Sequence, residues 1–432
     1  MPAPVPPLPS PTPTAVEDTP TEQAVSGAGH RLRLTLLMAG SCLPILGAVL
    51  IAPVLPQMQA HFADVPGVDA LVPMALTIPA LSLALLAPFA GVIVDRLGRK
   101  RLLVVSTVLY AILGTAPLWL DSLGAIVASR ALVGVAEAAI MTCSTTLIGD
   151  YYSGRQRDRY LAMQTMCASI SATAFFVLGG AAGSAGWRAP FWAYAVSLLL
   201  APAMAAFLPR PRPAAHANEP SPVGAEPTEP AVKRRPFPWR PLAGTCALTV
   251  FGAILFYTVQ VEMAFLLNDV GVSNPGVIGL ATAGSSAAVV VGAVVFAKAG
   301  RSPQAWLPTA FGLSALGFAV IWLAPNPVAL TAGAVINCLG SGIMLPSLLT
   351  LAMSKLDYAD RGRGTGLWTG SFFLGQFICP LVVLALTSAT GTLANALGVL
   401  ALAGTAATAA LGLTARRRRT EATPEPIRQT AG

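Results

Sequence analysis

Apolar segments of about 20 residues alternate with short polar segments along most of the chain, and this pattern predicts a polytopic membrane protein. A helix of that length crosses the hydrocarbon core of a bilayer. In the first half, the predicted spans are 34–55, 70–94, 102–120, 123–148, 160–182 and 190–208. In the second half, they are 241–267, 277–297, 306–324, 328–351, 366–386 and 393–413.

The spacing of these spans predicts an all-α membrane fold of two six-helix bundles related by pseudo-two-fold symmetry. We expect a disordered Pro-rich cytoplasmic tail at 1–33, the N-terminal bundle at 34–208, a cytoplasmic linker at 209–240, the C-terminal bundle at 241–414 and a basic cytoplasmic tail at 415–432. A weak internal repeat supports two related halves, because Ala139-Ile140-Met141 and Gly342-Ile343-Met344 occupy corresponding positions.

Composition excludes an ordinary soluble protein, since 54% of the residues are hydrophobic and only 11% are charged. The net charge of +8 does not indicate nucleic-acid binding, because the basic residues lie in short loops between apolar segments. Basic loops follow the positive-inside rule. With both termini in the cytoplasm, 25 of the 27 Lys and Arg residues are inside, leaving Arg188 outside and Arg130 within a span.

The sequence gives little support for a disulfide, a metal site or ATP hydrolysis. Six cysteines lie inside apolar segments without a Cys-x-x-Cys pair, which favours packing roles over disulfide or metal roles. His30, His61 and His216 fall in tails or loops, and no phosphate-binding Gly-x-x-x-x-Gly-Lys-[Ser/Thr] motif is present. We therefore expect no enzyme, no metal and no cofactor, and a membrane enzyme or receptor is a remote alternative.

A charged loop between the second and third predicted spans carries the most specific motif. Its members are Gly91, Asp95, Arg96, Gly98, Arg99, Lys100 and Arg101. We expect Gly91 to allow close backbone approach, Gly98 to supply the turn, and the cations to hold the loop at the headgroup boundary. Asp95 either meets the positive N-terminus of the eleventh span, near Gly364, or ends its own helix in solvent.

These residues and their position resemble the loop signature of the major facilitator superfamily, and the resemblance covers the chain apart from its tails and linker. It implies transport by alternating access and a gating role for this loop, in which Asp95 latches the two halves together. The counterpart loop between spans eight and nine keeps a Gly and an Arg, Gly300 and Arg301, but has no acidic residue.

Shorter motifs resemble the drug:proton antiporter branch of that superfamily. They are Leu55-Pro56 and Arg130-x-x-x-Gly134, whereas Phe175-Phe176 stands where the branch carries Gly-Pro in its fifth span. The resemblance thus implies proton-coupled efflux of a drug or metabolite by a plasma-membrane antiporter. The departure in the fifth span leaves proton-coupled uptake as the alternative. The implied partners are a small-molecule substrate, protons and the lipid bilayer; we expect a monomer and no nucleic acid.

Charges inside the spans are functional candidates, because they are costly in hydrocarbon. Arg130, Gly134 and Glu137 share one helical face, with Glu137 near mid-membrane and Arg130 two turns closer to the outside. Desolvation favours the neutral carboxyl, so Glu137 can exchange a proton whenever water reaches it. We predict that Glu137 carries the coupling proton and that Arg130 shapes its field. The alternative is a structural Arg–Glu network.

Glu262 is the third buried charge and lies toward the outer end of the seventh span. It is a proton-coupling candidate, or it reaches the outer interface. Polar and aromatic candidates for the substrate cavity are Tyr257, Gln164, Asn337, Trp368 and Gln376. Each is also consistent with an interhelical hydrogen bond or a packing role.

Overall fold

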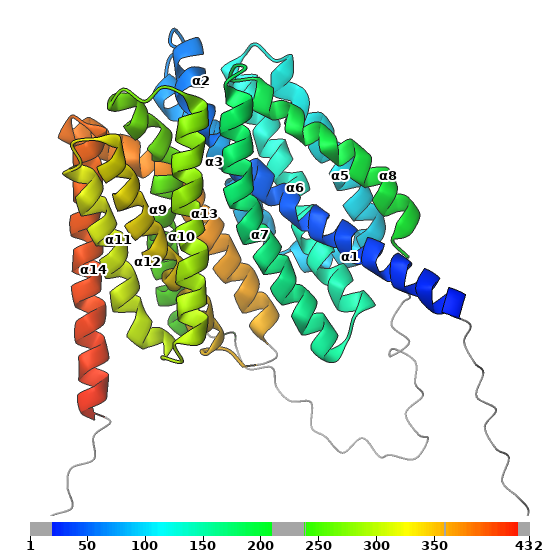
Figure 1. Ribbon diagram of the computed structural model, residues 1–432. Helices are drawn as coiled ribbons and strands as arrows, with labels where there is room; N and C mark the ends of the chain where they lie inside the picture. The colour runs from blue at the N-terminus through cyan, green and yellow to red at the C-terminus, as the bar shows by residue number, and fades with distance from the viewer. Residues whose placement is uncertain (1–19, 210–236, 238, 358–359, 422–432) are drawn as a thin grey trace, which may run out of the picture.

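The computed structural model describes residues 20–209, 237, 239–357 and 360–421, and the regular structure in this part of the chain is helical (Figure 1). The first half contains α1 (Pro20–Val49), η1 (Ala52–Val54), α2 (Leu55–His61), α3 (Val68–Leu86), α4 (Ala90–Leu97), α5 (Arg99–Thr115), η2 (Ala116–Leu118), α6 (Leu123–Tyr151), α7 (Gly154–Gly183), η3 (Ala189–Val196) and α8 (Ser197–Phe207). The second half contains α9 (Trp239–Asp269), α10 (Pro275–Lys298), α11 (Pro303–Trp322), α12 (Pro327–Met353), α13 (Arg361–Thr390) and α14 (Leu393–Glu421).

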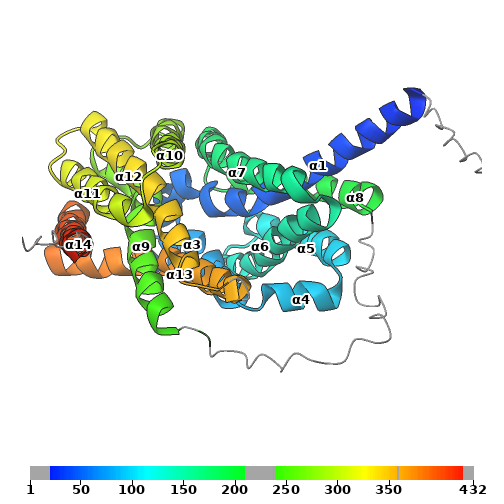
Figure 2. The same cartoon turned by 90° about the horizontal axis from the view of Figure 1, so that it is seen from below.

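Twelve stretches of the described chain are long and apolar enough to cross a membrane, six in each half, which confirms the predicted number and order of spans. The protein is therefore a multi-pass membrane protein. Viewed along the bundle, α1 and α4–α8 form one group and α9–α12 with α14 form the other, while α3 and α13 lie where the groups meet (Figure 2).

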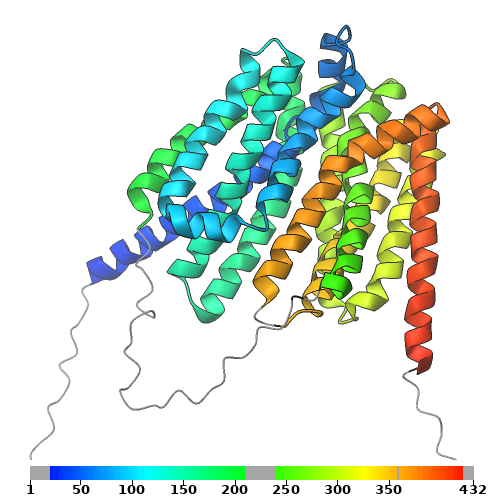
Figure 3. The same cartoon turned by 180° about the vertical axis from the view of Figure 1, so that it is seen from behind.

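The described ends of the chain lie at the same end of the bundle, where α1 begins and α14 ends (Figure 3). The junction of α4 and α5 lies at this end too, with Arg96 in the last turn of α4 and Lys100 and Arg101 in the first turn of α5. We call this end of the bundle the basic end, and we call the other end of the bundle the opposite face.

Two predicted boundaries differ from the structure. Helix α1 begins at Pro20, so residues 20–33 are helical and do not belong to a disordered tail; residues 1–19 lie outside the described residues. Proline suits the first position of a helix, and the stretch after it contains no further proline until Pro44. At the other end of the chain, α14 continues to Glu421, into the segment predicted as a basic tail. Most of the predicted linker, 210–236 and 238, also lies outside the described residues.

The second predicted span, 70–94, is two helices and not one. Helix α3 ends at Leu86 and α4 begins at Ala90, with Pro88 in the break. A proline cannot donate to the helical ladder, although Pro73 and Pro79 are tolerated within α3. As a result α4 lies across the bundle axis at the basic end (Figures 2 and 3).

The two halves meet through small residues. At the opposite face, Gly180 of α7 and Gly279 of α10 are so close that a Cβ on either would overlap the other helix. Toward the basic end, Gly366 and Gly370 of α13 lie against the backbone carbonyls of Ala87 and Ala84. Small residues allow this approach, which is how helices associate in membranes without a hydrophobic driving force.

Candidate functional site

Helix α6 carries the two charged candidates of the N-terminal half, Arg130 and Glu137, into the bundle interior. Their exposed fractions are 0% and 2%. The approach of α6 to α3 depends on Gly134, because a Cβ there would overlap the backbone of Pro79. Polar groups buried this deeply need partners from neighbouring helices, so the contacts of each residue show what it does.

The guanidinium of Arg130 is held by groups from three other elements. Its Nε donates to the carbonyl of Ala75 in α3 at 3.2 Å, and its Nη2 donates to the carbonyl of Gly47 in α1 at 2.7 Å. Its Nη1 donates to the hydroxyl of Tyr194 in η3 at 2.6 Å. Arg130 therefore ties α6 to α1, α3 and η3 through neutral acceptors.

Two tyrosines complete this cluster, and the sequence did not single out either of them. The rings of Tyr110 and Tyr194 lie 5.1 Å apart, and the Tyr110 hydroxyl donates to the Leu43 carbonyl at 2.5 Å. The Arg130 guanidinium also lies over the Tyr194 ring, 5.3 Å from its centroid. Gly114 makes room for Tyr194, since a Cβ there would overlap the ring. The only signal in the sequence was a tyrosine inside an apolar span.

Glu137 lies directly against Gly47 of α1. A Cβ at position 47 would overlap the Glu137 carboxylate, and it would also lie 3.4 Å from the Tyr110 hydroxyl. Oε1 of Glu137 is buried and has no hydrogen-bond partner among the described residues. The described chain also contains no ion pair between Glu137 and Arg130. Gly47 thus contacts both residues, through its carbonyl and through its Cα.

The loop residues lie at the basic end, around Arg99. Arg99 donates to Asp95 at 2.8 Å and to Asp150 at the end of α6. Gly98 has a positive φ of 84°, so it supplies the turn into α5 as predicted. The prediction for Gly91 is wrong in this structure, because a Cβ there would meet open space. The break at Pro88 turns α4 toward α5 and α6, and the close approach to α13 falls on Ala84 and Ala87 instead.

Asp95 is 62% exposed and its ion-pair partner is Arg99, on the same half of the protein. Arg96 and Arg101 are exposed, and Lys100 is partly buried. The N-terminus of α13, where the latch partner was predicted, packs Gly364 against Leu356. The latch stays a prediction.

Helices α9 and α13 of the C-terminal half carry four of the other candidates. Phe372 joins two of them, because its ring centroid lies 5.4 Å from that of Tyr257 and 5.9 Å from that of Trp368. Gln376 is 3% exposed, and its Oε1 has no hydrogen-bond partner among the described residues. Glu262 is 5% exposed and lines a cavity at the opposite face.

Two candidates make interhelical hydrogen bonds. Gln164 of α7 donates to the Ser41 hydroxyl of α1 at 2.7 Å and to Thr145 of α6 at 3.2 Å. Asn337 of α12 is fully buried and donates to the carbonyl of Ser314 in α11 at 3.1 Å. Asn337 thus lies between two helices of one half.

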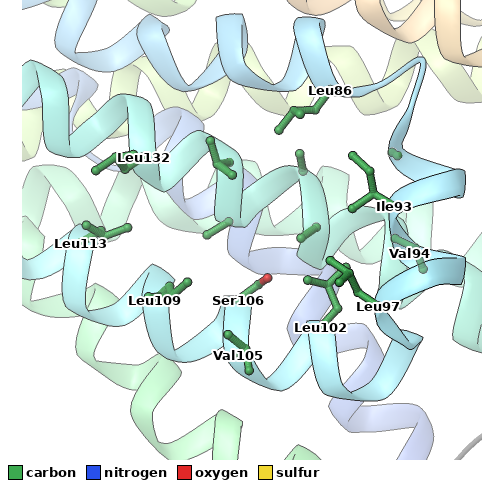
Figure 4. A pocket seen from close by; sticks show the side chains of 15 residues that line it. Leu86, Ile93, Val94, Leu97, Leu102, Val105, Ser106, Leu109, Leu113 and Leu132 are labelled. Atoms are coloured by element: carbon green, nitrogen blue, oxygen red, sulfur yellow. The ribbon is translucent and has the colours of Figure 1, made fainter.

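An apolar groove of about 320 Å³ lies between α4, α5 and α6 (Figure 4). Its labelled side chains are aliphatic apart from Ser106. Two of them, Leu97 and Leu132, are more than half exposed. The lining contains no charged group, so the groove has no means to couple protons.

Comparison with known proteins shows the family. The family model described as Major Facilitator Superfamily matches residues 37–358. The chain belongs to the major facilitator superfamily. This family consists of transporters, which are not enzymes.

Curated relatives of this superfamily member match part of its length. Protein spinster homolog 3 of Danio rerio is 28% identical over 255 residues, which cover 56% of this chain and 49% of that protein. The class C tetracycline resistance protein of Escherichia coli is 31% identical over 168 residues, 38% of this chain and 41% of that protein. The chain thus spans about half or less of the length of these relatives.

Solved structures share the fold over nearly the whole chain. A peptide transporter POT in complex with alafosfalin has a TM-score of 0.70 at 16% identity, covering 89% of this chain and 94% of that one. A bacterial homolog of the human lysosomal transporter Spinster, in an inward-facing and occupied conformation, has a TM-score of 0.66 at 15% identity, covering 95% and 100%. At such identities the likeness shows the fold alone.

Proposed function

We propose that this protein exports a small organic solute across the cell membrane in exchange for protons, with Glu137 as the proton carrier. The observation that carries the proposal is the environment of Glu137. Its carboxyl is buried, one of its oxygens has no hydrogen-bond partner among the described residues, and it lies against the backbone of Gly47 in α1.

The absence of an Arg130–Glu137 ion pair in the described chain supports a transferable proton. A carboxylate clamped by a guanidinium keeps its charge, whereas an unclamped carboxyl in a dry site is neutral until water reaches it. Arg130 is already satisfied by two carbonyls and a hydroxyl, so its charge acts on Glu137 through space. Movement of α1 changes the surroundings of both residues together, because Gly47 contacts both.

The proposed transport mechanism is alternating access. A ligand shifts a two-state equilibrium only through a difference in its affinity for the two states. Protonation of Glu137 provides that difference if the neutral carboxyl favours one arrangement of α1 and the charged carboxyl favours the other. In this proposal the halves rock about the glycine contacts between α7 and α10 and between α13 and α3, where the backbones approach closely.

Export is supported by the relatives whose names describe it, the tetracycline resistance protein and the efflux pump dotC of Dothistroma septosporum. The orientation is supported by the basic end, which under the positive-inside rule faces the cytoplasm and puts both termini there. Uptake is the second candidate, because Phe175-Phe176 replaces the pair that drug antiporters carry in the fifth span.

The sign of flux in proteoliposomes tests this proposal. Purified protein is reconstituted, a pH gradient is imposed, and accumulation of tetracycline, tetraphenylphosphonium, a dipeptide and a sugar is followed. An antiporter accumulates its solute in vesicles with an acidic lumen, because protons leave as solute enters. Accumulation only with an acidic exterior would establish uptake instead. Accumulation of a solute to the same level with and without the pH gradient would contradict proton coupling.

A further inference from the structure

A cavity of about 340 Å³ opens at the opposite face, between the two halves of the protein. Helices α2 and α3 supply Gln59, Asp69 and Pro73, and α9, α13 and α14 supply the remaining lining residues. It is separate from the Arg130–Glu137 cluster, which lies within the N-terminal half. It is therefore a place distinct from that cluster.

Three carboxylates line this cavity. Asp69 lies in the first turn of α3, and its Oδ1 accepts a hydrogen bond from the Gln59 amide at 2.6 Å. Glu262 and Asp269 are seven residues apart on α9 and so share one helical face. Glu262 is 5% exposed, faces this cavity, and has no hydrogen-bond or ion-pair partner among the described residues. It is an unpartnered buried acid directed into the cavity.

Helix ends of both signs lie at the cavity. Helix α9 ends at Asp269 and α13 ends at Thr390, while α3 begins at Val68 and α14 begins at Leu393, so the negative charge of the site comes from the three carboxylates. Thr387, in the last turn of α13, lines the cavity with an Oγ1 that has no hydrogen-bond partner among the described residues. The lining in this part of the structure includes no Lys, Arg or His. The cavity therefore selects positive charge.

The rest of the lining determines the kind of cation. Apolar side chains supply much of the wall: Pro73, Phe265, Pro380, Val383, Leu384 and Leu393. Among the described residues, no three His, Cys, Asp or Glu side chains are grouped closely enough to hold a metal ion. Pockets of this size that bind small molecules combine apolar walls with a few placed polar groups.

We propose that this cavity binds amphipathic organic cations, with their charge on Glu262, Asp69 and Asp269 and their apolar part against Phe265 and the α13 side chains. Binding itself is independent of proton coupling. A role for the cavity as the release site of an exported solute rests on the function proposed above.

Equilibrium dialysis of radiolabelled tetraphenylphosphonium against the purified full-length protein in detergent tests the site. We expect saturable binding that Asp69→Asn and Glu262→Gln each weaken at least tenfold. Asp64→Asn is the matched control, because Asp64 is an exposed carboxylate at the same face that does not line the cavity. Tetraphenylborate, which has the same shape and the opposite charge, should not lose affinity in these variants. Equal tetraphenylphosphonium affinity in all four proteins would overturn the proposal.

A labelling experiment keeps the test valid if a charge variant folds poorly. A cysteine placed at Ser388, an exposed residue that lines the cavity, should react with a membrane-impermeant maleimide, and tetraphenylphosphonium should slow that reaction at least fivefold. A cysteine placed at Asp64 should react at the same rate with and without the cation. Lack of protection at position 388 would overturn the proposal. Neither assay uses a pH gradient. If cation binding is absent, the proposal of proton-driven flux through Glu137 is unaffected. If proton-driven flux is absent, the proposed binding site is unaffected.

Discussion

Glu137 of α6 and Gly47 of α1 lie so close together that a methyl group at position 47 would occupy the place of the carboxylate. The glycine therefore sets both the position of Glu137 and the distance between the two helices. It also accepts a hydrogen bond from Arg130 through its carbonyl, at 2.7 Å. Gly47 of α1 thus contacts both Arg130 and Glu137.

Gly47→Ala tests this contact. Overpacking a buried position costs about 1–3 kcal/mol, and the displaced carboxylate would no longer face the same groups. We expect lower thermal stability and at least a tenfold loss of proton-driven flux. Gly284→Ala, in a helix position where a Cβ meets nothing within 4 Å, should leave both at the level of the unaltered protein. Normal proton-driven flux in Gly47→Ala would show that the contact is dispensable.

Arg130→Lys tests whether the guanidinium is a structural tie. Lysine is a compact charge without the planar fork that reaches Ala75, Gly47 and Tyr194 together. Loss of hydrogen bonds from a buried charged donor should lower the free energy of unfolding by at least about 2 kcal/mol, visible as a lower melting temperature. Tyr194→Phe removes a single acceptor of the charged guanidinium and should cost about 1.5–3 kcal/mol. Arg159→Lys, at an exposed position, is the control; an equal melting temperature for the position-130 and position-159 variants would contradict the tie.

Asp95→Asn tests the loop. Asp95 is 62% exposed, so its ion pair with Arg99 contributes little stability, and the melting temperature should change by no more than 1–2 °C, which is about what a few tenths of a kcal/mol produces. If the carboxylate reaches the N-terminus of α13 in another state of the cycle, its loss should slow turnover severalfold without changing the KM for the solute. The matched control is Asp158→Asn, an exposed carboxylate on α7. Unchanged turnover in Asp95→Asn would remove the latch role.

The sequence predicted the fold because the bilayer imposes a simple rule on it. Spans of about 20 apolar residues are readable one segment at a time, and the count of twelve is confirmed. The boundaries were less predictable. Pro88 lies in a helix break whereas Pro73 and Pro79 lie within α3, so the presence of a proline alone does not predict where a helix ends.

The site was predictable only in part. Helical periodicity places Arg130 and Glu137 on one face, but it says nothing of the partners that other helices bring. Tyr194, Tyr110 and Gly47 come from three different elements, and the carbonyls that bind Arg130 carry no side-chain signature. Asn337, predicted as either a cavity residue or an interhelical hydrogen-bond residue, donates a hydrogen bond to Ser314 in its own half; polarity in a span does not say which neighbour a residue faces.

The most direct test of the account is proton-driven flux by Glu137→Gln in proteoliposomes, measured beside solute counterflow in the same vesicles. Glutamine keeps the shape of the side chain but cannot carry the proton. The account predicts that accumulation driven by the pH gradient falls to the level of empty vesicles, while counterflow without a gradient stays within about threefold of the unaltered protein, roughly 0.7 kcal/mol in the barrier. Accumulation driven by the pH gradient at the unaltered rate would contradict it.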